Sequence, residues 1–428
     1  MQSLKAFRAA IVHSLSDSAF DYYPDGLLLV SNGLITACGP ADQLLPSLSP
    51  STPIETFPDS LLLPGLIDTH IHYPQVEVLG SYGTKLLEWL QNYTFPTEGK
   101  FKNPIEARRV ADFFLQELLR NGTTTALVFC AVFKESVTAF FEAAQEKGLR
   151  MIAGKVMMDR NAPQYLLDTA ESSYTDSKEL IQHWHGVDRL LYAVTPRFAI
   201  TSTEEQLQRA AALRKEFPGV YLHTHLAEEA KEVEFVRTLF PQATSYLDVY
   251  RNCELLGPRA VFAHSIHLSE EDRSLLAHTG SSIAFCPTSN LFLGSGLFDY
   301  AATSAHQIRI GLGTDVGGGT SFSMLRTLAE AYKVMQLQGQ SLDVKRTLYL
   351  ATLGGAKALY LDHILGNFEP GKEADFCILD LKATPLISFR LQTAKSIEEQ
   401  LFALFTLGDD RVVRATYAQG RCVHSRDR

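Results

Sequence analysis

The protein is a chain of 428 residues, in which 48 acidic side chains outnumber 39 Lys and Arg and give a formal net charge of −9. With 46% hydrophobic and 20% charged residues, the composition supports a large folded core and excludes a disordered chain. The acidic balance argues against a broad basic face, so we expect a small-molecule substrate and no nucleic-acid partner.

The chain has no apolar segment of membrane-spanning length. The longest unbroken apolar run covers residues 126–133, whereas a spanning helix needs about 18 apolar residues. Near the N-terminus only residues 9–12 are continuously apolar, which is shorter than the core of a secretory signal. The six cysteines include no Cys-x-x-Cys pair, as expected of reduced thiols. We therefore predict a cytoplasmic protein without a membrane partner.

Strand and helix patterns alternate through the middle of the chain. Asn103 precedes a predicted helix that begins at Pro104 and ends near Asn121, and residues 202–205 form a capping box that starts another. Runs rich in β-branched and apolar residues predict eight strands, at 66–72, 123–131, 151–158, 190–198, 220–226, 260–267, 282–287 and 308–314. This alternation predicts an α/β fold of the (β/α)8 TIM-like barrel type, with a doubly wound open sheet as the rival interpretation.

The two ends of the chain have a different pattern. They contain short predicted strands separated by turns, at 7–11, 26–30, 34–37, 52–57, 374–379 and 412–423. Neither flank, at roughly 60 residues, is long enough to bury a sufficient core alone. We therefore predict a composite β-sandwich domain of residues 1–64 and 366–428, beside a barrel of residues 65–365.

The pair His70 and His72 ends the first predicted barrel strand. Residues two apart in a strand point to the same side, so both imidazoles face the mouth of the barrel. Such a pair suits a metal ion, although an isolated His-x-His can equally belong to the core.

Later strand ends repeat this chemistry. His223 and His225, then His264, then Asp315 all follow the predicted strands at the end where barrel enzymes place their active sites. Nitrogen and carboxylate donors without a thiolate predict a catalytic divalent metal such as zinc, with a position open for water. Alternation alone does not separate His223 from His225, because both face the same way.

Glu228 follows His225 by three residues. A carboxyl group just beyond a strand end can reach the mouth and move a proton for a metal-activated water. The alternative interpretation is that Glu228 and Glu229 begin the next helix and stabilise its N-terminal dipole.

Residues 64–72, together with His225, His264, Asp315 and the segment 370–376, resemble the amidohydrolase superfamily. The resemblance implies that His70, His72, His225 and Asp315 hold the metal and that His264 orients the attacking water or the departing tetrahedral intermediate. Binuclear members carry a bridging lysine or acid on strand four, where this chain offers only Arg197 as a charged residue. One divalent metal, preferably Zn²⁺, is therefore expected.

Within the superfamily the chain is most similar to the guanine deaminase family, on residues 72–75, 86–90, 93–96, 195–198 and 225–228. The loop 73–103 is the longest inside the predicted barrel, and its length predicts that it covers the substrate. The resemblance implies that Gln75 and Arg197 read the purine and that Phe198 lines the ring pocket. It implies catalytic roles for Glu228, Asp315 and His264. The implied substrate contacts are His72, Gln75, Arg197, Phe198, His225, Glu228 and Asp315.

The resulting hypothesis is zinc-dependent hydrolysis of free guanine to xanthine and ammonia, as a step of purine catabolism, by an enzyme that the resemblance implies is a homodimer. A second hypothesis keeps the chemistry and changes the substrate to another amino-heterocycle, such as an oxidised guanine, cytosine or a triazine. A third is a non-catalytic scaffold with the same fold, which is disfavoured because every expected metal ligand is present.

Overall fold

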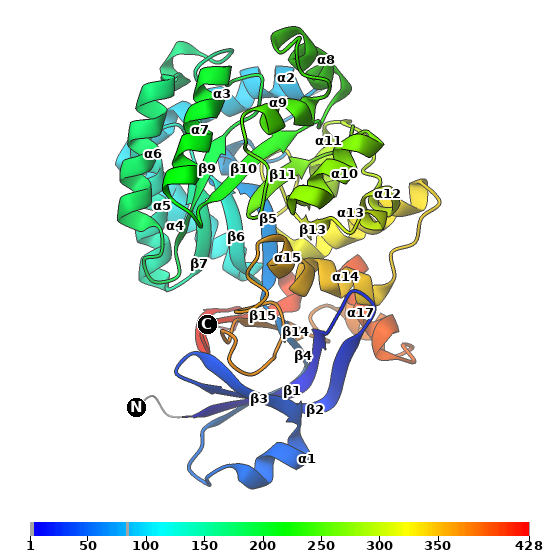
Figure 1. Ribbon diagram of the computed structural model, residues 1–428. Helices are drawn as coiled ribbons and strands as arrows, with labels where there is room; N and C mark the ends of the chain where they lie inside the picture. The colour runs from blue at the N-terminus through cyan, green and yellow to red at the C-terminus, as the bar shows by residue number, and fades with distance from the viewer. Residues whose placement is uncertain (1–3, 83–84, 428) are drawn as a thin grey trace.

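A parallel barrel occupies the middle of the chain in the computed structural model, which describes residues 4–82 and 85–427 (Figure 1). Within the described residues its strands neighbour one another in chain order, with the short β8 (Val156–Met157) paired to β9. The strands are β5 (Leu66–His72), β6 (Thr123–Phe129), β7 (Arg150–Gly154), β9 (Leu191–Pro196), β10 (Tyr221–Leu226), β11 (Ala260–His264), β12 (Ser282–Phe285) and β13 (Arg309–Leu312). The predicted (β/α)8 barrel is confirmed, and each of the eight predicted strands overlaps a strand of the structure.

The barrel closes where the chain after β13 meets β5. The Asp315 amide donates to the His70 carbonyl at 2.9 Å, and the His72 amide donates to the Val316 carbonyl at 2.8 Å. The same contacts that close the barrel therefore bring Asp315 beside the two histidines of β5.

Helices cover the outside of the barrel (Figure 1). α4 begins after Asn103, whose side chain accepts from the Ile105 amide, and α7 begins after Thr203, whose side chain accepts from the Gln206 amide. Both helices lie where the capping signals predict them. The helices that follow the barrel strands are α4 (Pro104–Arg120), α5 (Lys134–Lys147), α6 (Ala170–Trp184), α7 (Glu204–Glu216), α8 (Ala230–Leu239), α9 (Tyr246–Asn252), α10 (Glu270–Thr279), α11 (Pro287–Phe292), α12 (Tyr300–Ala305), α13 (Met324–Leu337), α14 (Val344–Ala351) and α15 (Leu353–Ala358).

One segment between β5 and α4 crosses the mouth of the barrel as short helical turns instead of the predicted loop. Of the predicted range 73–103, residues 83 and 84 lie outside the described residues. The turns are η2 (Tyr73–Val78), α2 (Leu86–Trp89), η3 (Leu90–Thr94), α3 (Phe95–Glu98) and η4 (Gly99–Lys102). We call residues 73–102 the cover segment.

Both ends of the chain form one mixed sheet below the barrel (Figure 1). Its strand order is β16-β15-β14-β4-β1-β2-β3, so hydrogen bonds link the described terminal strands into one continuous sheet rather than the two sheets of a sandwich. The strands are β1 (Lys5–Ser14), β2 (Phe20–Ser31), β3 (Leu34–Pro40), β4 (Ile54–Pro64), β14 (Phe376–Asp380), β15 (Val413–Ala418) and β16 (Arg421–Ser425), with α1 (Ala41–Leu44) and η1 (Leu45–Ser47) after β3.

The C-terminal segment also contains helices that the strand pattern does not predict. α16 (Pro385–Leu391) and α17 (Ile397–Leu407) interrupt it, and α17 contacts the barrel helix α13. The short turns η5 (Gln164–Leu166) and η6 (Asp410–Val412) complete the elements. The exact domain boundaries at residues 64/65 and 365/366 stay a prediction. Across the described residues, the helices are all too short or too polar to cross a bilayer.

A buried ion cluster joins the terminal sheet to the base of the barrel. Arg150 Nε donates to Glu373 at 2.8 Å, and Arg189 donates to Glu373 at 2.6 Å and also to Asp375. Burial raises the pKa of the Glu373 carboxyl, but the two guanidinium groups outweigh burial and leave that pKa below its usual value. Ionised Glu373 therefore links the terminal sheet to the barrel through ion pairs with two arginines.

The barrel interior changes from apolar to polar towards the mouth. One apolar layer at the base includes Ile67, Leu127, Ile152 and Tyr221. On β10 the inward positions above Tyr221 are His223 and then His225, because side chains alternate along a strand. The polar residues therefore stand on a packed floor, which fixes the strands that carry them.

Candidate metal centre and active site

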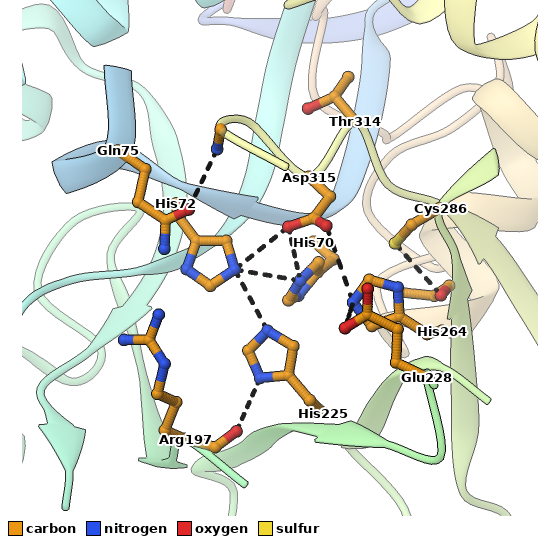
Figure 2. Close-up of polar contacts among 12 residues, drawn as sticks. His70, His72, Gln75, Arg197, His225, Glu228, His264, Cys286, Thr314 and Asp315 are labelled. Carbon is orange, nitrogen blue, oxygen red and sulfur yellow. Dashed lines mark hydrogen bonds and ion pairs between the residues drawn. The ribbon is translucent and has the colours of Figure 1, made fainter. Parts of the chain in front are cut away.

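Four candidate ligands converge at the mouth of the barrel (Figure 2). His70 Nε2 lies 3.2 Å from His72 Nε2, and His72 Nε2 lies 3.3 Å from His225 Nε2. Asp315 Oδ1 lies 3.1 Å from His70 Nε2 and 3.2 Å from His72 Nε2. The three histidines come from β5 and β10 and the aspartate from the segment after β13, so these contacts depend on the complete barrel.

These spacings are short enough for the four side chains to bind one shared metal ion. Two ligand nitrogens at roughly 2.1 Å from one ion, separated by a tetrahedral angle, lie about 3.4 Å apart. Burial lowers the pKa of His72 to about 3, so its imidazole is neutral and presents a lone pair. Burial opposes ionisation of Asp315, but His70 and His72 outweigh it and hold the pKa of that carboxyl well below its usual value. A carboxylate and neutral imidazoles are the protonation states that a divalent cation requires.

Contacts outside the group of Nε2 atoms hold the three imidazoles in place. His225 Nδ1 donates to the Arg197 carbonyl at 2.7 Å, which leaves Nε2 as the free lone pair. His70 Nδ1 lies 2.7 Å from His223 Nε2. The Phe129 ring packs against His72 and His225, at centroid distances of 4.5 and 4.7 Å. The tautomer of His225 is therefore defined, and packing against Phe129 leaves the rings of His72 and His225 little freedom to rotate.

His225, rather than His223, stands at the mouth. His223 lies one step deeper on β10 and contacts the Nδ1 side of His70, away from the group of Nε2 atoms. The ambiguity left by strand alternation is therefore resolved by depth in the barrel, and His223 supports His70.

A second possible ligand group, His70, His264 and Cys286, has one donor atom from each residue within 4.8 Å of the others. Burial raises the pKa of the Cys286 thiol well above its usual value, and its Sγ donates to the Ala284 carbonyl at 3.5 Å. A protonated thiol is a poor metal ligand. The group with His72, His225 and Asp315 is therefore the stronger candidate.

Asp68 connects the strand ends that carry the ligands. Its Oδ1 accepts from the His70 amide at 3.2 Å and from the Thr314 amide at 3.1 Å, and its other oxygen accepts from the Thr314 hydroxyl. Burial raises the pKa of this carboxyl to about 7. Asp68 thereby holds β5 against the residue that precedes Asp315.

Glu228 and His264 face the ligand group from the other side (Figure 2). Glu228 Oε2 lies 3.4 Å from His264 Nε2, and Glu228 Oε1 accepts from the Ser295 hydroxyl at 3.1 Å. His264 Nδ1 donates to the Asn290 side chain at 2.8 Å, and its Nε2 lies 3.7 Å from Asp315. Burial is the main cause that raises the pKa of the Glu228 carboxyl well above its usual value. A buried carboxyl that holds its proton can act as a general acid.

Gln75, Arg197 and Phe198 lie in the same cavity as the ligand group. The cavity is lined by His72, Gln75, Leu86, Trp89, Leu90, Arg197, Phe198, His225, Glu228, His264, Leu293, Asp315 and Gly318. Every sequence-predicted site residue except His70 is in this lining, and His70 contacts it through His72 and Asp315. The cavity therefore combines metal-ligating, acid–base and hydrogen-bonding groups.

Comparison with known proteins shows the family to which the chain belongs. The amidohydrolase family model matches residues 61–423. The chain belongs to the amidohydrolase family. This amidohydrolase is similar to the guanine deaminase of Escherichia coli (strain K12), with 52% identity over 96% of this chain and 93% of the relative.

Solved structures of guanine deaminases are also similar to this amidohydrolase. The E. coli guanine deaminase structure matches with a TM-score of 0.97 and 50% identity over 99% of this chain and 100% of that one. A structure of guanine deaminase from C. acetobutylicum, described with bound guanine in the active site, matches with a TM-score of 0.90 and 28% identity over 99% and 100%. The family is metal-dependent, which agrees with the donor set at the mouth.

Several site residues of this amidohydrolase carry no signal that sequence reasoning used. Glu98 of the cover segment accepts hydrogen bonds from both Gln75 and Arg197. Trp89 also lines the cavity, and the Ser295 hydroxyl donates to Glu228. The stretches 86–90 and 93–96 that resemble the guanine deaminase family include Trp89 and end two residues before Glu98. They point to the cover segment, although not to its contacts, and Ser295 lies outside them.

Proposed function

We propose that this protein is a guanine deaminase, which hydrolyses free guanine to xanthine and ammonia. One observation carries the proposal: the buried side chains of Gln75 and Arg197 line one cavity with Glu228 and the histidine–aspartate group. The similarity to guanine deaminases over nearly the whole chain supports the same substrate.

One divalent metal ion, preferably Zn²⁺, is held by His70, His72, His225 and Asp315 in this proposal. When bound, such an ion lowers the pKa of a coordinated water and provides a nucleophile at neutral pH. Three nitrogens and one carboxylate oxygen suit zinc, and no second donor set with a bridging acid or lysine accompanies them among the described residues. Lys155, between β7 and β8, pairs instead with Asp168 outside this group.

The side chains of the site then move protons during hydrolysis. Attack of water forms a bond from oxygen to C2 of guanine, and the bond from C2 to the amino nitrogen breaks. Asp315 accepts a proton from the attacking water, and Glu228 donates its proton to a ring nitrogen, which makes C2 more electrophilic. Glu228, now ionised, takes the proton of the new C2 hydroxyl group and passes it to the departing amine, so that ammonia leaves and C2 becomes a carbonyl. The proton held by Asp315 then restores the Glu228 carboxyl. His264, held by Asn290, orients the oxygen that is added.

Gln75, Arg197 and Phe198 hold the base in the proposed complex. An amide offers both donors and acceptors, and a guanidinium donates to the carbonyl or imidazole edge of a purine. Phe198 and Trp89 supply apolar surface for the ring. The cytoplasmic location and the homodimer that the resemblance implies stay predictions.

Ammonia release from a panel of nucleobases tests the proposal. Guanine, 8-oxoguanine, cytosine and an aminotriazine are incubated with enzyme whose metal content has been measured. We expect the highest kcat/KM with guanine and one equivalent of xanthine for each ammonia. A clear preference for cytosine or the triazine would replace guanine as the substrate, and a protein that purifies without metal and releases no ammonia would support the scaffold hypothesis.

A further inference from the structure

Glu98 is a buried carboxylate whose partners are both base-reading side chains. It ends α3 in the cover segment, and its side chain is 1% exposed. Oε1 accepts from Gln75 Nε2 at 3.0 Å and from Arg197 Nη1 at 2.9 Å, while Oε2 accepts from the same Arg197 nitrogen at 2.8 Å. One residue of the cover segment thus connects two walls of the cavity, from η2 and from the end of β9.

The carboxylate fixes which way the Gln75 amide points. Gln75 Nε2 donates to Glu98, and Gln75 Oε1 accepts from the Gly317 amide at 3.2 Å. Rotation of the amide by half a turn would place its oxygen against a carboxylate and its NH₂ group against an N–H. Only one orientation is therefore satisfied, and it leaves one N–H and one lone pair of Gln75 for a ligand.

The same carboxylate also fixes the Arg197 guanidinium. Arg197 is buried, and a buried cation requires a counter-charge. Both bonds to Glu98 use Nη1, whereas Nε and Nη2 make no hydrogen bond to any described residue. The Phe95 ring lies 5.4 Å from the guanidinium carbon and restricts its plane. Arg197 is therefore held with two donor nitrogens available for an acceptor on the ligand.

We propose that Glu98 is a positioning residue that makes the cavity selective for a purine bearing a carbonyl acceptor. The inference rests on the proposed function, in which Gln75 and Arg197 read the base. Donors held in fixed positions form hydrogen bonds with a ligand that carries an acceptor. With a purine that lacks the acceptor these donors stay without a partner, so that purine binds more weakly. Glu98 touches neither the ligand group nor Glu228 through any hydrogen bond among the described residues, so it acts on base binding rather than on bond breaking.

The test compares two ligands without the 2-amino group, which the enzyme cannot deaminate. Hypoxanthine carries the carbonyl and unsubstituted purine does not. Their Kd values are measured by titration calorimetry on metal-loaded wild-type enzyme and on Glu98→Gln. We expect hypoxanthine to bind more tightly than purine in the wild type, and the ratio of the two Kd values to shrink about tenfold in Glu98→Gln, since charge-assisted hydrogen bonds are lost. With guanine, KM is expected to rise about tenfold while kcat stays within about threefold.

Glu77→Gln is the matched control. Glu77 lies in the same cover segment two residues from Gln75, but its carboxylate pairs with Lys100 and Arg109 at the surface. This variant loses the same charge and is expected to keep the wild-type ratio of Kd values.

An unchanged ratio in folded Glu98→Gln would overturn the proposal, as would an equal loss in Glu77→Gln. If Glu98→Gln does not fold, Glu98→Asp serves instead, because it keeps the charge but cannot reach both partners. A folded Glu98→Asp protein with the wild-type ratio would also overturn it. Failure of the proposed function is distinguishable, because it is a lack of guanine turnover in wild-type enzyme, whereas the Kd ratio needs no turnover.

Discussion

Replacing Glu228 with glutamine isolates proton transfer from the rest of the site. The substitution keeps the size of the side chain and an oxygen that accepts from the Ser295 hydroxyl, now 3.1 Å from Oε1. It removes the proton that the buried carboxyl holds because burial raises its pKa. The candidate ligands His70, His72, His225 and Asp315 are not changed, so metal content is expected to stay at the wild-type level.

The expected loss follows from the role of a general acid–base group. Such a group typically contributes about 10² to 10⁴ in rate, and here one carboxyl is proposed to serve two successive proton transfers. We therefore expect kcat for guanine to fall at least about 10³-fold in Glu228→Gln. KM is expected to change much less, since Gln75, Arg197 and Phe198 still hold the base.

Steady-state kinetics with metal analysis on the same sample provides the assay. Glu229→Gln is the control, because Glu229 is also buried and adjacent in sequence but caps α8. It is expected to retain kcat within about threefold. Metal-loaded Glu228→Gln with full guanine turnover would refute the proton-transfer argument, and an equal loss in Glu229→Gln would attribute the effect to the local backbone.

Three further predictions concern the metal, the domain junction and the cover segment. His225→Ala removes one of the four candidate donors, so elemental analysis is expected to find well under one metal per chain, and a full equivalent would remove His225 from the ligand set. Glu373→Gln leaves Arg150 and Arg189 without their shared counter-charge, so denaturant unfolding is expected to show a loss of about 3–5 kcal/mol, with kcat of the folded enzyme unchanged. The folded-state pKa of Glu373 lies below its usual value, so ionised Glu373 contributes to the free energy of unfolding above about pH 4.5, and this contribution is lost as pH falls through the folded pKa. Between about pH 5 and 3 the free energy of unfolding should therefore fall less in Glu373→Gln than in the wild type. Parallel curves of unfolding free energy against pH would contradict this. Trp89→Ala removes apolar surface from the cavity and is expected to raise KM for guanine with a smaller change in kcat, whereas an unchanged KM would show that the indole does not contact the base.

The sequence predicts the barrel and the positions of the candidate ligands because both follow from local periodicity. Buried parallel strands are rich in apolar residues, and a polar residue can mark the end of such a run, as His264 does after residues 260–263. The order of strands around a barrel then brings their ends together without further information. Alternation along a strand does not distinguish His223 from His225, because it predicts the face of the strand to which a side chain points and not how deep in the barrel the residue lies.

The cover segment and its contacts could not be predicted in the same way. Its short turns have no sustained helical or strand period, and Glu98 meets Arg197 across 99 positions in the sequence. The helices α16 and α17 were missed because the strand pattern on either side of them suggested a purely β domain. In both places the conformation depends on tertiary contacts, which local propensities do not reveal.

Metal titration of the apoenzyme with guanine as substrate tests the central claim most directly. Metal is removed with a chelator, Zn²⁺ is added back in steps, and xanthine formation is followed at each step. We expect no turnover without metal and a linear rise that reaches its plateau at one zinc per chain. Guanine turnover by metal-free protein, or a plateau at two zinc ions per chain, would contradict a single metal centre built from His70, His72, His225 and Asp315.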